Sequence, residues 1–235
     1  MMNPLKVIGC IVLSIFFLFG EDETKTTKVA CVGDSITHGA RLEQRDLHSY
    51  PAQLQTLLGA GYEVENFGVS SCTLLRKGRP TVWNQLSKIE ASNPDVIVIS
   101  LGTNDTCGMG TCGDRKCWEY QDEFADDYRD LIDRLELLPS KPEIIICAPT
   151  PMVLETPGLS DTRKNGLIIR KPRLQTLIKI IKGVAKEKDV VFMDLNTPLQ
   201  HRPELFTEKD GVHPNKAGYL EIAQLIYEKI KSIGD

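Results

Sequence analysis

The sequence lacks an excess of charge of either sign. Its 28 Lys and Arg residues and 32 Asp and Glu residues leave a formal net charge of −4. This balance leaves no excess of basic residues for binding nucleic acid. No run of like charge is long enough to suggest an interaction tail. Internal repeats, low-complexity tracts and linkers are absent too. We therefore expect one domain that binds no nucleic acid, since 235 residues can bury a sizeable core.

Long apolar runs are also scarce. The most apolar stretch is VIGCIVLSIFFLFG at residues 7–20, which follows Lys6 and precedes the acidic EDE. It is too short to span a bilayer comfortably, and a basic start before a short apolar segment is typical of a secretory signal. We expect residues 1–20 to be a signal peptide and the mature chain to be secreted or extracytoplasmic, without a stable membrane span. An uncleaved anchor or a misassigned start stays open, because Leu18 and Gly20 match the usual cleavage pattern poorly.

Cysteines are few, and their spacing is informative. Six lie outside the apolar stretch: Cys31, Cys72, Cys107, Cys112, Cys117 and Cys147. The spacing of Cys107, Cys112 and Cys117 lacks the short C-x2-C step and the obvious fourth ligand of a zinc site. We favour one or two disulfides that close this loop, with Cys72 as a candidate partner for the third cysteine. Cys31 and Cys147 lie in apolar strand patterns and are expected to be buried thiols.

Short apolar segments alternate with amphipathic ones along the chain. The predicted strands are residues 28–33, 62–68, 95–102, 143–149 and 190–195, and the predicted helices are residues 49–61, 81–93, 119–138, 174–188 and 216–233. This alternation predicts a parallel sheet with helices on both faces. Such sheets place ligands at the carboxyl ends of their strands, near the topological switch point.

Residues that could perform chemistry follow three of these strands. Ser35 comes directly after the first strand, in GDSIT, at the start of a helical turn whose free N–H groups favour negative charge. Gly68 ends the second strand, where the missing side chain would let its N–H approach a bound oxygen. Asn104 follows the third strand and carries an amide that can donate to an oxyanion. Each of them alone is better explained as a turn or cap residue.

Asp210 and His213 lie three residues apart in KDGVHPN, just before the last predicted helix. A histidine oriented by a carboxylate is the base half of a serine triad. Alone, the pair is equally explained by a capped helix start with a solvated histidine. Combined with Ser35, Gly68 and Asn104 at one edge of the sheet, it predicts a nucleophile, a base and an oxyanion site.

The order and spacing of these motifs resemble those of the SGNH hydrolases, also called the GDSL esterase family, from GDSIT to DGVHPN. The resemblance implies a flavodoxin-like α/β/α sandwich with a five-stranded parallel sheet over residues 28–235. SYPAQLQTLLG, YEVENFGVSSCTLL and WNQ are similar to the branch of acetylesterases that act on carbohydrate, such as sialate or xylan O-acetylesterases. The loop from Cys107 to Cys117 departs from the compact family pattern.

The resemblance implies a carboxylic ester hydrolase that forms an acyl-enzyme on Ser35. His213 would be the base and Asp210 its partner, while Ser35, Gly68 and Asn104 would form the oxyanion hole. Neither a metal nor a cofactor is expected. The substrate would be a short-chain ester, chiefly acetyl, on a small molecule or glycan. A lipid-directed esterase or lysophospholipase stays open, and so does a non-catalytic carbohydrate-binding protein.

Each of the other candidate residues has a structural explanation as well as a functional one. His38 either lines the pocket or packs near it, and His48 and His201 are expected at structural or surface positions. The basic segment RKGR, which holds Arg76, Lys77 and Arg79, is either a solvated loop or a site for an anionic sugar. Trp83 either stacks on a sugar or anchors its helix in the core, and we favour the anchor.

Overall fold

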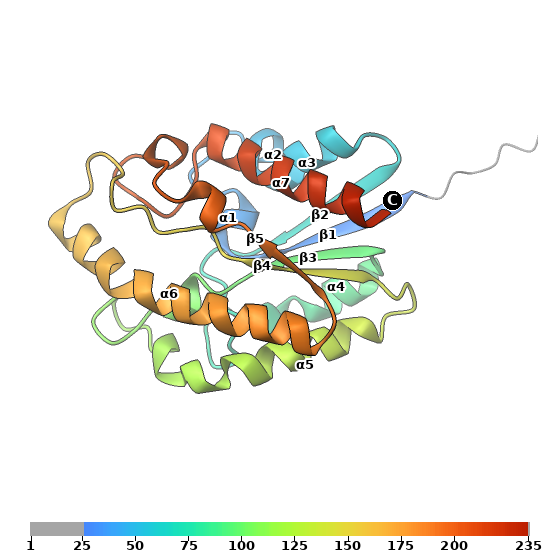
Figure 1. Ribbon diagram of the computed structural model, residues 1–235, viewed down its shortest axis with the longest axis horizontal. Helices are drawn as coiled ribbons and strands as arrows, with labels where there is room; N and C mark the ends of the chain where they lie inside the picture. Colours follow the sequence, from blue (N-terminus) through green and yellow to red (C-terminus); the bar gives the residue numbers. More distant parts are fainter. Residues whose placement is uncertain (1–25, 235) are drawn as a thin grey trace, which may run out of the picture.

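The computed structural model describes residues 26–234, so the expected signal peptide lies outside the described part. Five parallel strands form one sheet in the order β2-β1-β3-β4-β5 (Figure 1). Their bounds are β1 (Thr27–Gly33), β2 (Tyr62–Gly68), β3 (Val96–Ser100), β4 (Glu143–Ala148) and β5 (Val191–Asp194). This is the flavodoxin-like order, and it confirms the predicted fold class.

Helices cover both faces of the sheet (Figure 1). One face carries α1 (Ser35–His38), α2 (Arg45–His48), α3 (Tyr50–Leu58) and α7 (Lys216–Gly234), and the other carries α4 (Leu86–Ser92), α5 (Phe124–Glu136) and α6 (Asp161–Glu187). Short 3₁₀ turns span Val82–Asn84, Asn104–Thr106, Cys117–Glu123, Thr197–Leu199 and Pro203–Leu205. Between residues 26 and 234, no helix combines the length and apolarity needed to cross a membrane.

The apolar core explains why the sequences of the strands are continuously hydrophobic. In β1, Val29 and Cys31 join the core cluster beneath α3 and α7, while Ala30 and Val32 join the cluster beneath α4 and α5. All four are fully buried, because a parallel sheet between two helical layers buries both of its faces.

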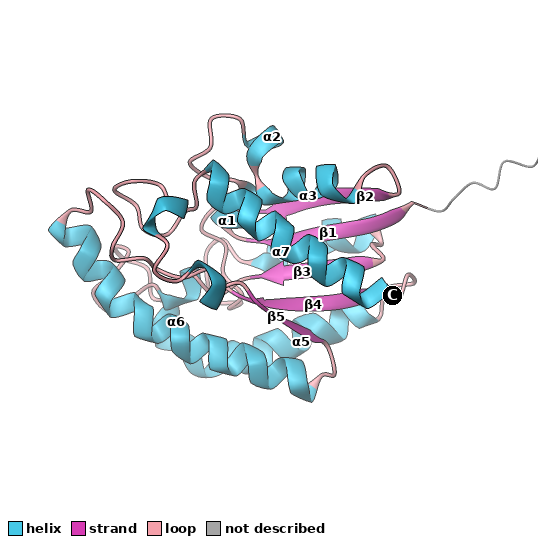
Figure 2. Cartoon of the chain, turned by 45° about the horizontal axis from the view of Figure 1, so that its top comes forward, coloured by secondary structure: helices cyan, strands magenta, loops and turns pink. Residues whose placement is uncertain are grey.

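Strand order determines where the chain can build a site. From β1 the chain passes to β2 on one side and later to β3 on the other, so the crossovers diverge at the carboxyl end of β1. Such a switch point leaves a crevice outside the strand ends. Figure 2 shows all strand arrows pointing to the same side of the molecule, where the long loops gather.

The prediction for α6 was wrong at its start: the helix begins at Asp161, not at residue 174. Pro172 lies inside this helix, although a proline normally ends or kinks a helix. Here the N-terminus is capped by Ser160, whose Oγ accepts from the N–H of Arg163 at 3.2 Å. The additional turns extend past the strand ends (Figure 2) and bring basic side chains to the loops there.

The cysteine predictions are partly confirmed. A disulfide joins Cys107 and Cys112, which removes two sulfurs from the alternative zinc site. The pairing of Cys117 with Cys72 was wrong, because both are free, buried thiols. Cys31 and Cys147 are buried free thiols, as predicted, and burial raises the pKa of Cys31 to about 12.

Candidate active site

A cleft of about 550 Å³ opens at the carboxyl ends of β1 and β3. Three of the predicted site residues line it: Ser35, Asn104 and His213. The lining also includes two serines that follow β2 and four arginines, namely Ser70, Ser71, Arg41, Arg115, Arg163 and Arg170. The cleft is therefore polar and rich in positive charge.

Ser35 occupies the first position of α1 because the chain turns sharply after β1. Gly33 permits the turn, since a Cβ there would meet Thr37 Oγ1 at 2.0 Å. Asp34 caps the helix, and its Oδ1 accepts from the N–H of Ile36 at 2.9 Å. Burial raises the pKa of the Asp34 carboxyl, against the opposing effect of that hydrogen bond. The N–H of Ser35 belongs to the group of helix-start donors that have no partner within the helix.

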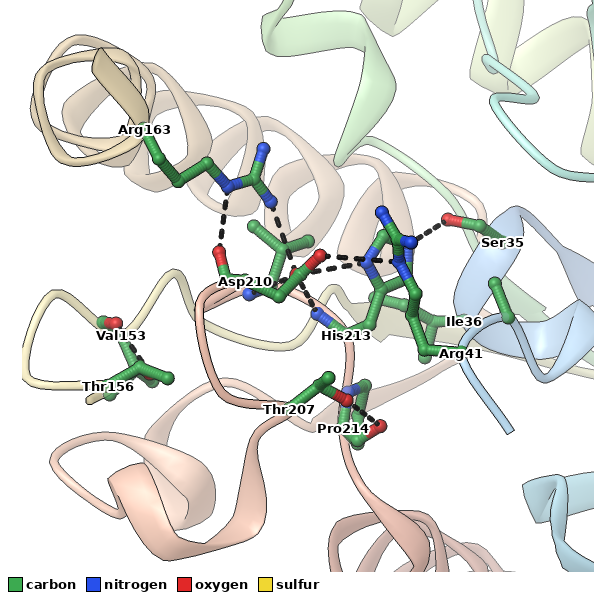
Figure 3. Close-up of polar contacts among 12 residues, drawn as sticks. Ser35, Ile36, Arg41, Val153, Thr156, Arg163, Thr207, Asp210, His213 and Pro214 are labelled. Carbon is green, nitrogen blue, oxygen red and sulfur yellow. Dashed lines mark hydrogen bonds and ion pairs between the residues drawn. The ribbon is translucent and has the colours of Figure 1, made fainter. Parts of the chain in front are cut away.

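Ser35, His213 and Asp210 form a continuous hydrogen-bonded chain (Figure 3). Ser35 Oγ lies 2.8 Å from His213 Nε2, and His213 Nδ1 lies 3.0 Å from Asp210 Oδ1. The loop before α7 fixes this geometry locally, because Asp210 Oδ1 also accepts from the backbone N–H groups of Val212 at 2.9 Å and His213 at 2.8 Å. A histidine held by a carboxylate on Nδ1 can take a proton from a hydroxyl on Nε2.

Asp210 is kept ionised by its surroundings. Burial alone would raise its pKa, but hydrogen bonds and charge from His213, with the charge of Arg163, hold the pKa well below its ordinary value. Arg163 Nη2 lies 3.2 Å from Oδ1, and Arg163 Nε donates to the Asp210 carbonyl at 2.8 Å. Arg41 Nε lies 3.6 Å from Oδ2 on the solvent side. Figure 3 shows both arginines reaching Asp210 from different elements.

The Asn104 amide lies beside the turn that carries Ser35. Its Nδ2 donates to the Cys72 carbonyl at 3.1 Å and to Asp34 Oδ2 at 3.3 Å. Its Oδ1 accepts from Arg115 Nη1 at 3.1 Å. An arginine can only donate, so this contact fixes which amide atom is oxygen and points the NH₂ group toward Asp34.

Asp105, the next residue, connects this turn to the segment that follows β2. Its carboxylate accepts from the N–H groups of Leu74 at 3.2 Å and Leu75 at 2.9 Å. Burial raises the pKa of Asp105 to about 7, although these hydrogen bonds oppose the rise. Asp105 therefore aligns two loops of the site and titrates close to neutral pH.

Gly68, the predicted second backbone donor, does not line the cleft with the others. Its N–H donates to Asn66 Oδ1 at 2.9 Å, and a Cβ on Gly68 would meet the His38 nitrogen at 2.1 Å. Glycine is needed here for close packing against α1. Ser71, three residues later, lines the cleft and has a φ of 67°, and its N–H donates to no described residue. Sequence reasoning missed this residue, which ends the same ENFGVSS motif.

The lesser candidates lie outside the cleft lining. His38 Nδ1 lies 3.2 Å from the Gly68 carbonyl and next to Arg45, and exposed His201 lies 2.9 Å from Glu155 Oε1. His48 is half-buried at the end of α2. Trp83 donates from Nε1 to the Leu74 carbonyl at 2.9 Å, with Arg76 over its ring, so the structure favours the anchor interpretation.

Arginines of α6 hold the loop beside the site. Sequence reasoning missed them because it predicted that the helix begins too late in the sequence. Arg170 is buried and donates to the Thr103 carbonyl at 2.7 Å and to Thr106 Oγ1 at 2.9 Å. Burial, with the charges of neighbouring arginines, lowers its pKa to about 10, which still leaves it charged at neutral pH. Arg173 donates to the carbonyls of Thr106 and Gly108. Together they hold the loop that carries Asn104.

Known esterases resemble this chain in sequence or in fold. An acetylxylan esterase of Xylanibacter ruminicola is 33% identical over 223 residues, covering 87% of this chain and 43% of that protein, so this chain spans less than half of the relative's length. Est24, a carbohydrate acetylesterase from Sinorhizobium meliloti, shares the fold at 20% identity with a TM-score of 0.68, covering 88% of this chain and 100% of that one. An aryl esterase of M. smegmatis does so at 20% identity and a TM-score of 0.65, covering 88% and 99%.

The family assignment rests on most of the described chain. Residues 31–220 match the GDSL-like Lipase/Acylhydrolase family. This range begins in β1, just before Ser35, and ends in α7, after His213. It therefore includes both sides of the cleft, and the chain belongs to the GDSL-like lipase/acylhydrolase family.

Proposed function

We propose that the protein is a serine esterase that removes short acyl groups, chiefly acetyl, from carbohydrate. The observation that carries this proposal is the chain from Ser35 Oγ through His213 to Asp210, with contacts of 2.8 and 3.0 Å, at the edge of an open cleft. The name of the acetylxylan esterase relative supports the substrate class. Secretion after removal of residues 1–20 is part of the proposal, since polymeric glycans lie outside the cell.

In the proposed reaction Ser35 Oγ attacks the ester carbonyl carbon while His213 Nε2 takes the hydroxyl proton. The tetrahedral intermediate collapses, the C–O bond to the sugar breaks, and His213 passes the proton to the leaving alcohol. Water then attacks the acyl-enzyme by the same route and releases the carboxylic acid. Asp210 keeps the imidazole in the correct tautomer and stabilises its charged form.

For the oxyanion we propose three donors: the N–H of Ser35, the Nδ2 of Asn104 and the N–H of Ser71. Ser71 replaces Gly68 in this role, because the Gly68 N–H is occupied by Asn66. The Asn104 amide would exchange its longer contact, 3.3 Å to Asp34, for the oxyanion. Donors of this kind act most strongly when they are fixed before the reaction.

The cleft favours a sugar over a lipid chain. Arginines and hydroxyl groups line it, and such groups bind sugar hydroxyls and carboxylates but leave an acyl chain without apolar contacts. A lysophospholipase would need an apolar channel. A series of nitrophenyl esters separates the two: highest kcat/KM on the acetyl ester supports the proposal, and highest kcat/KM on the octanoyl ester supports a lipid substrate.

The central experiment measures acetate release from acetylated xylan by the wild type and by Ser35→Ala. We expect loss of at least about 10³-fold in kcat, because the variant lacks its nucleophile. A fluorophosphonate should label the wild type at Ser35 and leave the variant unlabelled. Full activity of Ser35→Ala would contradict the proposal. A wild type that is not labelled and hydrolyses no ester would indicate a non-catalytic binding protein.

A further inference from the structure

A second cavity, of about 440 Å³, adjoins the cleft. We call it the basic cavity; four cations, one carboxylate and one aromatic ring line it: Lys77, Arg79, Arg115, Lys116, Asp114 and Tyr120. Arg115 also lines the cleft, so the two hollows meet at this side chain. A ligand with its ester at Ser35 and a neighbouring group in the basic cavity would pass Arg115.

Most of the positive charge in the basic cavity is not neutralised. Lys77 pairs with Glu123, but Arg79 donates to the carbonyls of Arg76 and Gly78. Arg115 also has neutral acceptors, and Lys116 forms no ion pair with a described residue. Asp114 is the single carboxylate in the lining. The cavity is therefore strongly positive in a chain whose formal net charge is −4.

Two features make the basic cavity a site and not merely a charged surface. It is bounded by two segments far apart in sequence, residues 77–79 and 114–120. One wall carries the ring of Tyr120, and Lys77 Nζ lies 4.5 Å from its centroid. Lys77 lies over one face of this ring, so the cations of the cavity, not ring stacking, would bind the carboxylate of a sugar.

We propose that the basic cavity binds a carboxylate on the glycan, so that the enzyme prefers acetyl groups on acidic sugars. This inference rests on the proposed esterase function and defines its substrate class. The shared chemistry is a sugar carboxylate, which a uronate in a plant polysaccharide or a sialate could supply. Arg79 and Lys116, whose charges have no carboxylate partner, would make the main contacts.

The test compares substrates that differ only in charge. Initial rates of acetate release are measured on acetylated glucuronoxylan and on the same polymer after its carboxyl groups are reduced to alcohols. A second pair, an O-acetylated sialoside and its methyl ester, separates the two sources of carboxylate. We expect kcat/KM to be about tenfold higher on whichever acidic substrate is the source, because hydrogen bonds to charged groups are the stronger ones.

Variants locate the effect in the basic cavity. Arg79→Gln with Lys116→Gln should abolish the preference for the acidic substrate and leave hydrolysis of nitrophenyl acetate unchanged, since that ester is too small to reach the cavity. Lys179→Gln with Lys186→Gln removes the same charge from exposed positions of α6 and should keep the preference. This pair controls for the net charge of the protein.

The outcomes separate the two proposals. Equal rates within both substrate pairs, with normal hydrolysis of nitrophenyl acetate, would overturn the carboxylate site and keep the esterase. A preference that both double variants lose equally would also overturn it, since it would then follow from overall charge. Absence of hydrolysis on every ester would contradict the esterase function itself.

Discussion

Arg115 Nη1 donates to Asn104 Oδ1 across 3.1 Å, and this contact orients the amide proposed for the oxyanion hole. The other nitrogen of the same guanidinium, Nη2, donates to the Ser71 carbonyl at 2.8 Å. One side chain therefore connects two of the three proposed oxyanion donors. It comes from the loop between Cys107 and Cys117, so this loop would support the proposed chemistry at the ends of the strands.

Replacing Arg115 should therefore impair chemistry more than binding. We expect Arg115→Met to lower kcat on nitrophenyl acetate by about 10-fold or more, with little change in KM, because the amide loses its fixed orientation. Arg115→Lys should restore part of kcat, since an ammonium can replace one of the two contacts. A melting temperature close to the wild type would exclude unfolding, and a higher KM at constant kcat would assign Arg115 to binding alone.

Asn104 and Gly68 should behave differently when replaced by alanine. Asn104→Ala removes a proposed donor and should lower kcat by about 10²–10³, with a modest change in melting temperature. Gly68→Ala should lower the melting temperature, because its Cβ would meet the His38 nitrogen at 2.1 Å. Thermal unfolding and kcat on nitrophenyl acetate, measured on both variants, check this contrast. An Asn104→Ala enzyme with normal kcat would remove the amide from the oxyanion hole.

Arg163 and Arg41 both lie near Asp210, and their effects should differ in size. Arg163 reaches Oδ1 at 3.2 Å and also binds the Asp210 carbonyl, whereas Arg41 is 62% exposed and 3.6 Å from Oδ2. Exposed ion pairs contribute little. We expect Arg163→Met to lower kcat severalfold and Arg41→Met to lower it less. Steady-state kinetics at pH 8 test this order. A larger effect of Arg41→Met would show that the exposed Arg41 contributes more than Arg163 to holding Asp210.

Asp105 should make stability depend on pH in the neutral range. Its pKa is raised from 3.8 to about 7 by burial, so the folded protein binds this proton more tightly than the unfolded chain. The contribution to stability is therefore complete below about pH 4 and is lost as the pH rises to about 7. Urea unfolding between pH 4 and 8 should show this decline in the wild type and a flatter profile in Asp105→Asn. Parallel profiles would show that Asp105 ionises normally.

The parts of the fold that could be predicted are those with a local cause. Strands buried on both faces must be continuously apolar, so β3 and β4 were evident in the sequence. The start of α6 was not, because Pro172 opposes a helix locally while the contacts of Arg163, Arg170 and Arg173 with distant loops stabilise it. Tertiary contacts outweighed a local rule that usually holds.

The proposed site also contains some residues that the sequence predicts and others that depend on the folded structure. Ser35, Asn104, Asp210 and His213 were found because each follows a strand or precedes a helix in a recognisable motif. Gly68 was chosen for its lack of a side chain, but that property serves packing against α1. The position of Ser71 depends on the turn after β2, and the Arg115–Asn104 contact depends on the folded loop. Neither has a signature in the sequence.

The Cys107–Cys112 bond has a consequence for the conditions under which the site is fully ordered. It joins the segment just after Asn104 to the loop that carries Arg115. Such bonds form and persist in oxidising compartments, so a newly made chain in a reducing cytosol would hold this loop by hydrogen bonds alone. Protein prepared without oxidation should therefore be a poorer esterase than the same chain allowed to oxidise, because the loop beside the proposed oxyanion hole would lack this covalent bond.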